Sequence, residues 1–254
     1  MQTIKPKKNL GQNFLVDQEI IELIVSSAVI KKDELIIEPG CGTGVVTKEL
    51  INTGAEIVGV EIDNELIPIL QNQFKSNKNF QLRTESVLST NFESLAGGKD
   101  YKVVGSIPYQ ISSPLIHKIL FENKKPKIVC IVLQKEVAEK IKGGVGDGTY
   151  LSNMVELFYE SKIVKFIKPE AFNPVPKVES ALLLLTLKKE IIDIDLKNFK
   201  GFLHKAFANR RKMLNKTFSI NDLQQAQIEP SARPQEIDLE KFIKLYHKTV
   251  TLGD

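Results

Sequence analysis

The segment Ser106-Ile107-Pro108-Tyr109 places a small hydroxyl side chain, a rigid proline and an aromatic ring close together. An exocyclic amine such as that of adenine is a poor nucleophile because its lone pair is delocalised into the ring. The Ser106 hydroxyl and the Ile107 carbonyl can accept hydrogen bonds from this amine, and Pro108 keeps the carbonyl aimed. Tyr109 can stack on a base that has left its helix. The residues favour methyl transfer to a polar nitrogen, although an ordinary proline turn is the alternative.

A glycine-rich loop, Glu38-Pro39-Gly40-Cys41-Gly42-Thr43-Gly44, follows a predicted strand and opens a predicted helix. Glycine at alternate positions lets the backbone approach a ligand closely, and a helix N-terminus adds free N–H groups. Glu61 ends the next predicted strand, where its carboxylate can accept hydrogen bonds from both hydroxyls of a ribose. The spacing Gly-x-Gly-x-Gly favours S-adenosylmethionine over a dinucleotide, although a tight structural turn is again the alternative.

Alternating strand and helix patterns must position these motifs. We expect strands at 35–37, 56–61, 80–83, 102–105 and 128–133, and helices at 45–51, with Thr43 as N-cap, at 64–74, from 113 onward and at 135–142. This alternation predicts an α/β fold with a parallel sheet between two layers of helices. Because ligands bind beyond the carboxyl ends of such strands, the glycine loop, Glu61 and the Ser106 segment should meet at one edge.

The second half of the chain changes character. A Gly-rich loop at 143–148 precedes a predicted helix at 150–159, and strands at 163–167 and 181–187 are expected to form an antiparallel pair at the sheet edge. Helical patterns without a strong strand follow from about residue 191. We therefore predict two domains, 1–190 with the sheet and 191–254 as a small all-α domain.

The net charge of +4 is modest, but the basic residues are clustered. They form two groups, Lys5, Lys7 and Lys8 near the N-terminus and Arg210, Arg211 and Lys212 near the C-terminus. Two separated basic patches suit a phosphate backbone, as in RNA, while solvated surface is the alternative.

Cysteine usage and hydropathy limit the other possibilities. Cys41 and Cys130 have no metal-ligand spacing and imply no disulfide framework, so we expect no metal and a reducing, cytoplasmic location. The apolar runs are too short to span a bilayer and the N-terminus lacks a signal-peptide core, so we expect no membrane association.

Six segments of the chain, in order, resemble motifs of the small-subunit ribosomal RNA adenine dimethyltransferases. They are Lys8–Leu15, Glu38–Gly44, Val60–Asp63, Ile107–Pro114, Phe172–Ser180 and Phe207–Leu214. The resemblance extends from about residue 5 to at least residue 218. The family is also similar to the erythromycin-resistance methylases of the large subunit.

The resemblance implies a Rossmann-like methyltransferase sheet with a small all-α C-terminal domain. It also implies dimethylation of adenines in small-subunit RNA in two successive transfers from S-adenosylmethionine. The implied partner is ribosomal RNA within an immature small subunit, and we expect a monomer. The implied cofactor residues are Gln12, Asn13, Leu15, Gly40, Gly42, Glu61, Ile62, Glu85, Ser86 and Ser106. The implied catalytic residues are Ser106, Ile107, Pro108, Tyr109 and Phe172, of which Phe172 covers the far face of the target adenine.

Two positions depart from the family pattern. Asn is usual where this chain has Ser106, and Asp is usual where it has Ser86. Both departures replace a stronger acceptor with a hydroxyl, so we expect weaker cofactor binding than is usual. Two alternatives stay open: a non-catalytic ribosome-assembly or nucleic-acid-binding factor on the same scaffold, and a large-subunit methylase. A nicotinamide-dependent oxidoreductase is disfavoured, because His117, His204 and His247 form no recognisable catalytic pattern.

Overall fold

The computed structural model describes residues 6–7, 10–144 and 146–250. The described residues form two compact units: unit 1 lies within Met1–Ala138 and Lys162–Leu187, and unit 2 lies within Glu139–Ser161 and Lys188–Asp254. Residues 139–161 thus join the C-terminal segment, which differs from the predicted division at residue 190. The Gly148 N–H donates to the Gln235 carbonyl at 3.2 Å, and the Tyr150 ring stacks on His204 at 4.1 Å.

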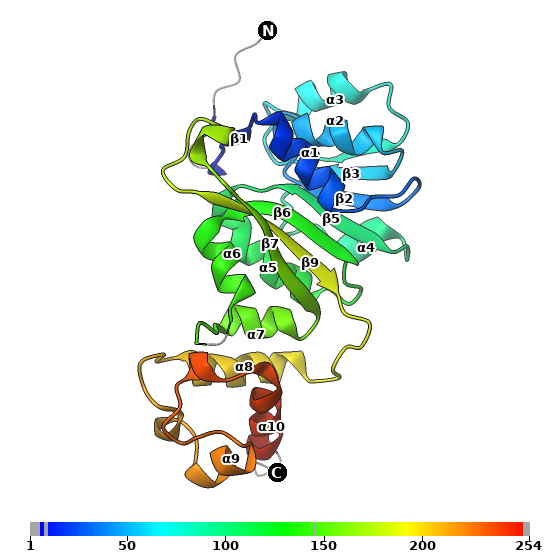
Figure 1. Cartoon of the computed structure of the whole chain (residues 1–254). Coiled ribbons are helices and arrows are strands. Elements are labelled where there is room, and N and C mark those ends of the chain that lie inside the picture. The colour runs from blue at the N-terminus through cyan, green and yellow to red at the C-terminus, as the bar shows by residue number, and fades with distance from the viewer. Residues whose placement is uncertain (1–5, 8–9, 145, 251–254) are drawn as a thin grey trace. The chain divides into compact units, whose positions relative to one another are not determined.

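The strands of the main sheet are β2 (Leu35–Pro39), β3 (Glu56–Val60), β4 (Phe80–Arg83), β5 (Tyr101–Ser106), β6 (Ile128–Gln134), β7 (Tyr159–Ile167) and β9 (Ser180–Leu187). Over the described residues, these seven strands are ordered β4-β3-β2-β5-β6-β9-β7 (Figure 1). The pairs from β4 through β6 are parallel, and β9 is antiparallel to β6. The predicted parallel strands are confirmed, and β7 begins four residues earlier than expected.

The helices of the first part of the chain are α1 (Gln18–Ser27), α2 (Val45–Asn52), α3 (Ile67–Phe74), α4 (Phe92–Ala96), α5 (Ser112–Phe121) and α6 (Lys135–Lys142). The predicted N-cap Thr43 is wrong, because Gly44 caps α2 with a left-handed φ of 80° and no side-chain bond. The predicted start of α3 at residue 64 is also too early. Helix α1 was not predicted, although its N-cap Asp17 accepts a hydrogen bond from the Ile20 N–H.

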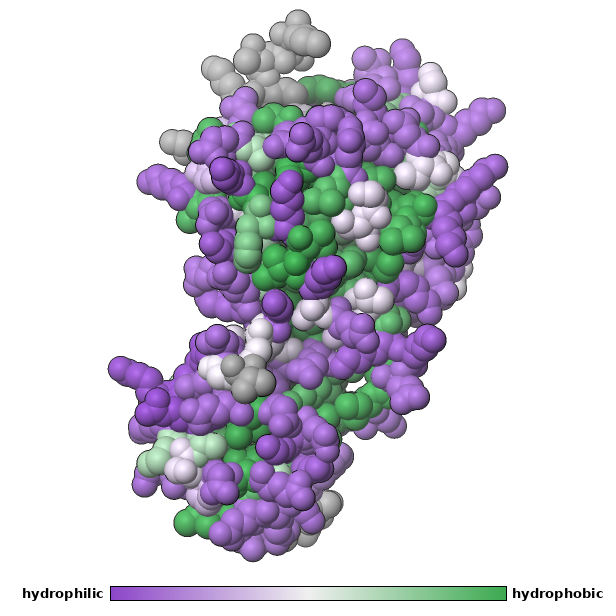
Figure 2. Space-filling view, in the orientation of Figure 1, coloured by the Kyte–Doolittle hydropathy of each residue, from purple (hydrophilic) through white to green (hydrophobic). Residues whose placement is uncertain are grey.

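Both faces of the sheet are covered, as the alternation of strands and helices predicted. Ile36 and Val104 belong to a buried cluster with Leu50 of α2 and residues of α1. Since side chains alternate along a strand, the buried Val103 faces the other side. Tyr101 shares that side and meets the α4 ring of Phe92 edge to face at 6.4 Å. Figure 2 shows apolar side chains gathered over the β6, β9 and β7 part of the molecule, amid mostly hydrophilic surface.

A second, two-stranded sheet was not predicted. Strand β1 (Phe14–Leu15) pairs antiparallel with β8 (Phe172–Asn173), so that Leu15 lies opposite Phe172. A short 3-10 turn, η3 (Pro169–Ala171), precedes β8. This pairing joins two of the family-like motifs, which are more than 150 residues apart in the sequence.

The remaining helices are α7 (Tyr150–Glu156), α8 (Leu196–Phe207), α9 (Ile220–Gln225) and α10 (Leu239–Val250), with 3-10 turns η4 (Leu214–Lys216) and η5 (Pro234–Glu236). The predicted helix at 150–159 is too long, since α7 ends at Glu156 and Tyr159 begins β7. Aromatic contacts form the core of unit 2: Phe202 lies 5.5 Å from Tyr246 and 6.3 Å from Phe242 between ring centroids. None of the described helices is long and apolar enough to cross a membrane.

Candidate active site

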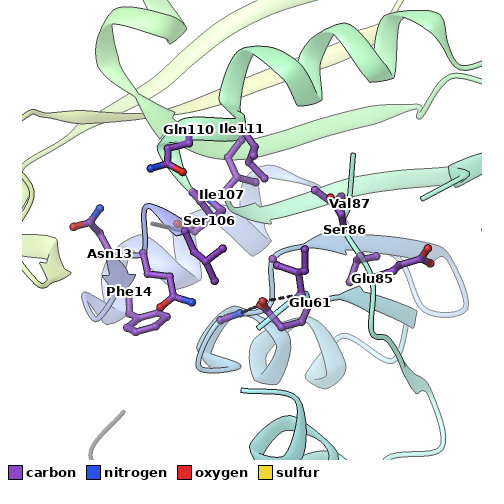
Figure 3. A pocket seen from close by; sticks show the side chains of 17 residues that line it. Asn13, Phe14, Glu61, Glu85, Ser86, Val87, Ser106, Ile107, Gln110 and Ile111 are labelled. Atoms are coloured by element: carbon purple, nitrogen blue, oxygen red, sulfur yellow. Dashed lines mark hydrogen bonds between the residues drawn. The ribbon is translucent and has the colours of Figure 1, made fainter. Parts of the chain in front are cut away.

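A pocket opens at the carboxyl ends of four neighbouring strands, β4, β3, β2 and β5 (Figure 3). It is lined by Leu10, Gln12, Asn13, Phe14, Gly40, Gly42, Val60, Glu61, Ile62, Glu85, Ser86, Val87, Ser106, Ile107, Pro108, Gln110 and Ile111. The expectation that the glycine loop, Glu61 and the Ser106 segment meet at one edge of the sheet is therefore confirmed.

Most of the predicted site residues line this pocket. Every predicted cofactor residue does so except Leu15, which is buried in the core and borders an adjoining recess. Of the predicted catalytic residues, Ser106, Ile107 and Pro108 line the pocket, whereas Tyr109 and Phe172 do not. Phe14 and Val87 also line the pocket but were not predicted, because their apolar side chains resemble ordinary core positions.

The glycine loop brings backbone to the pocket surface. Gly40 and Gly42 have φ values of 72° and 57°, in the left-handed region that strains other residues. A Cβ at Gly40 would lie 3.4 Å from the Pro108 side chain, and one at Gly42 would lie 3.4 Å from the Phe14 ring. Side chains here would fill the space where a ligand could meet the backbone.

Glu61 is held by the backbone around it. Its Oε2 accepts from the Gly42 N–H at 2.9 Å (Figure 3), and its Oε1 accepts from the N–H groups of Ile62 and Asp63, also at 2.9 Å. The residue is only 6% exposed, yet its carboxylate lines the pocket. A carboxylate has about four acceptor positions, so Oε2 retains capacity for a ligand hydroxyl. The arrangement fixes the carboxylate before any ligand arrives.

The end of β5 presents two free acceptors. Ser106 is the last residue of β5, and the Ile107 N–H donates to the Val132 carbonyl of β6 at 3.1 Å. Across the described part of the chain, neither the Ser106 hydroxyl nor the Ile107 carbonyl has a hydrogen-bond partner. Pro108, at φ −56°, then leads into a 3-10 turn, η2 (Tyr109–Ile111). Two acceptors beside the pocket match the need of an amine with two hydrogens.

Tyr109 and Phe172 meet edge to face, with ring centroids 6.4 Å apart and planes 71° from parallel. The Tyr109 hydroxyl forms a 2.6 Å hydrogen bond with the Ser180 hydroxyl. Phe172 is only 2% exposed and belongs to the core. A base can therefore lie between the two rings only if one of them turns. The predicted role of Phe172, to cover the far face of the target adenine, stays a prediction.

Ser86 and Glu85 follow β4 at the far side of the pocket. The Ser86 hydroxyl accepts a long hydrogen bond of 3.3 Å from the Leu88 N–H, while Glu85 is exposed. Both side chains can accept a hydrogen bond from a ligand amine. Ser86 would give up its weak bond to the Leu88 N–H, and Glu85 would exchange a hydrogen bond with solvent for one with the ligand.

The N-terminal segment is anchored beside the pocket through Asp63. Lys7 Nζ lies 2.5 Å from Asp63 Oδ1 and 3.0 Å from Glu65 Oε1. Gln12 Nε2 donates to Asp63 Oδ2 at 2.7 Å, and Gln12 Oε1 accepts from the Lys7 N–H. Burial favours a raised pKa for Asp63, but the bonds from Lys7 and Gln12 outweigh it and lower the pKa. Gln12 thus lines the pocket with its amide already engaged.

Sequence reasoning missed Glu38 as a site residue. It is 1% exposed, borders the recess that adjoins the pocket, and its Oε2 has no hydrogen-bond partner among the described residues. Burial raises the pKa of Glu38 to about 8. The signal was present, since a carboxylate at the end of an otherwise apolar buried strand is costly.

The predicted basic residues differ in their surroundings. Lys5 and Lys8 lie outside the described residues. Lys7 forms the ion pairs with Asp63 and Glu65. In unit 2, Arg210, Arg211 and Lys212 are exposed, and Arg210 donates to the Gly148 carbonyl at 3.1 Å. The RNA-binding role of all six stays a prediction.

A glycine loop after β2, an acid after β3 and free acceptors after β5 define an S-adenosylmethionine-dependent methyltransferase with a Rossmann-like fold. Comparisons with known proteins narrow this class. The family model described as ribosomal RNA adenine dimethylase matches residues 3–249. Ribosomal RNA small subunit methyltransferase A of Sulfurihydrogenibium sp. (strain YO3AOP1) is 36% identical over 250 residues, which cover 97% of each chain. The chain therefore belongs to the ribosomal RNA adenine dimethylase family, as its motifs predicted.

Two solved structures share the fold. A dimethyladenosine transferase from Plasmodium falciparum matches with a TM-score of 0.83 at 24% identity, covering 94% of this chain and 98% of that chain. The 23S rRNA methyltransferase ErmE matches with a TM-score of 0.77 at 24% identity, covering 93% and 99%. Both matches confirm the predicted Rossmann-like methyltransferase fold.

Proposed function

We propose that this protein transfers methyl groups from S-adenosylmethionine to the exocyclic amine of adenines in small-subunit ribosomal RNA, forming dimethyladenine in two transfers. The observation that carries the proposal is the pair of free acceptors, the Ser106 hydroxyl and the Ile107 carbonyl, beside a pocket that presents Glu61. The family supplies the class of substrate.

The pocket suits the cofactor on three counts. Glu61 offers acceptor capacity to ribose hydroxyls, and Ser86 and Glu85 offer acceptors to an adenine amine. The backbone at Gly40 and Gly42 is accessible to the methionine part because no side chain covers it. When bound, S-adenosylmethionine supplies an electrophilic methyl group on a sulfonium.

The chain's own residues would orient the target amine. Ser106 and Ile107 accept one hydrogen bond each from the amine, which directs the nitrogen lone pair toward the methyl carbon. Pro108 keeps the Ile107 carbonyl in place, and Tyr109 contacts the base. The nitrogen–carbon bond forms as the carbon–sulfur bond breaks, and the nitrogen then loses a proton to water. No side chain has to act as a general base, so alignment is the main catalytic contribution.

The hydroxyls of Ser86 and Ser106 are weaker hydrogen-bond acceptors than the side chains usual at these positions in the family. Each has one acceptor oxygen, whereas the Asp or Asn usual in the family has a carboxylate or amide. We expect weaker cofactor binding than in relatives, and Ser86→Asp should tighten it. Calorimetric titration of S-adenosylmethionine measures the effect, and equal affinities of both proteins would contradict it.

The RNA partner is expected to be part of an immature small subunit in the cytoplasm, contacted by a monomer. The exposed Arg210, Arg211 and Lys212 support contact with phosphates. A non-catalytic assembly factor is the competing function, and the departures at Ser86 and Ser106 favour it.

An assay with labelled S-adenosylmethionine and unmethylated small subunits tests the proposal. Wild type should label the RNA, and Tyr109→Ala should abolish the label while cofactor affinity stays within about twofold, since Tyr109 does not line the cofactor pocket. Binding of the subunit without any label would favour the assembly factor, and labelling of isolated large-subunit RNA alone would favour a large-subunit methylase.

A further inference from the structure

The Tyr109 hydroxyl has a specific partner far away in the sequence. Its oxygen lies 2.6 Å from Ser180 Oγ, across 71 residues, and either group can donate. Ser180 is the first residue of β9 and is 0% exposed. It lies opposite Gln134 in the β6–β9 ladder, so its position is fixed by the main sheet.

Tyr109 itself sits on a much less constrained element. It begins the 3-10 turn η2, which has three residues and leads into α5. Its ring meets Phe172 edge to face, and its hydroxyl is bonded to Ser180. Burial raises the pKa of Tyr109, so the phenol is neutral and keeps its proton at neutral pH. The hydroxyl bond therefore links a short turn to the rigid sheet.

We propose that Ser180 is a positioning residue, which fixes where the Tyr109 ring lies when the target adenine stacks against it. This inference rests on the proposed function, in which Tyr109 contacts the base. The hydroxyl oxygen lies on the axis about which the ring turns, so the bond to Ser180 fixes the direction of this axis whichever way the ring plane is turned. The position of the ring sets where the amine nitrogen lies relative to Ser106 and Ile107, and small misplacements reduce rates strongly.

The proposal predicts a specific kinetic pattern. Ser180→Ala and Tyr109→Phe each remove the same bond, and each should lower kcat about tenfold, the effect of losing one hydrogen bond. The double variant should be no slower than the slower single variant, because the bond is lost only once. Cofactor affinity should stay within about twofold in all three, since neither residue lines the cofactor pocket.

A matched control separates positioning from folding. Ser152 is another buried serine, whose hydroxyl donates to the Thr149 carbonyl and accepts from the Thr149 N–H at the start of α7 in unit 2. Ser152→Ala should lower thermal stability by an amount similar to Ser180→Ala while leaving kcat unchanged. If Ser180→Ala does not fold, Tyr109→Phe still tests the bond, because it keeps the ring and removes only the hydroxyl.

Steady-state methylation of unmethylated small subunits, with kcat and KM measured separately, decides between the outcomes. A kcat loss shared by both single variants and not multiplied in the double variant supports the proposal. Multiplied losses, or wild-type kcat in either single variant, overturn the role of Ser180 but leave the proposed function intact. A wild-type protein that transfers no methyl group overturns both.

Discussion

Glu61 offers the sharpest test of how the pocket is built. Glu61→Gln keeps the shape of the side chain and replaces one carboxylate oxygen with an NH2 group. The two N–H donors on Oε1 can keep an oxygen acceptor. The Gly42 N–H would then face a second donor, so that a buried hydrogen bond is lost rather than weakened.

The size of the effect follows from this arrangement. A hydrogen bond to a charged group contributes about 1.5–3 kcal/mol to stability. We therefore expect the free energy of unfolding to fall by about 2 kcal/mol, which lowers the melting temperature by about 4–8 °C in a chain of this size. The ribose hydroxyls lose their carboxylate acceptor as well, and a similar energy raises the cofactor Kd about 10- to 100-fold.

Glu56→Gln is the matched control for this experiment. Glu56 begins β3, the strand that Glu61 follows, is exposed, and pairs with Lys99 at 2.6 Å on the surface. Surface ion pairs contribute less than about 1 kcal/mol, so this variant should melt and bind nearly as wild type does. Thermal melting and calorimetric titration with S-adenosylmethionine measure both quantities. Wild-type stability and affinity in Glu61→Gln, or equal losses in the two variants, would refute the reasoning.

Three further predictions follow from the site. Asp63→Asn should raise the cofactor Kd by about tenfold, because it weakens the bonds from Lys7 and Gln12 that anchor the N-terminal segment. An unchanged affinity in calorimetric titration would count against this role of the anchor. Glu38 is protonated in the folded protein up to a pKa of about 8 but ionises near 4.5 when unfolded, so it lowers stability as pH rises between these values. Glu38→Gln should remove this slope of about 1.4 kcal/mol per pH unit, and parallel stability curves of variant and wild type from pH 5 to 8 would disprove it. Replacing Arg210, Arg211 and Lys212 with Ala should reduce the salt slope of RNA binding by about two to three, and an unchanged slope would return them to solvated surface.

The sequence was sufficient to predict those parts of the site that lie at the ends of successive strands. Gly40 and Glu61 each follow a buried strand, and Ser106 ends one. Parallel strands bring such residues to one edge of the sheet. The pocket could therefore be predicted from local patterns and the α/β alternation alone.

What was missed depends on contacts between distant residues. Strand β1 has two residues, too short for a periodic pattern, and it exists because β8 pairs with it. The bond between Tyr109 and Ser180 likewise depends on the antiparallel placement of β9 beside β6. The assignment of residues 139–161 to unit 2 depends on contacts such as that of Gly148 with Gln235.

The central claim is that the Ser106 segment orients an adenine amine of small-subunit RNA for methyl transfer. Mass spectrometry of small-subunit RNA from cells that contain or lack this protein tests it most directly. The account predicts dimethyladenine in the first RNA, unmodified adenine at the same positions in the second, and restoration by wild type but not by Tyr109→Ala. Identical adenine modification in both RNAs would contradict it.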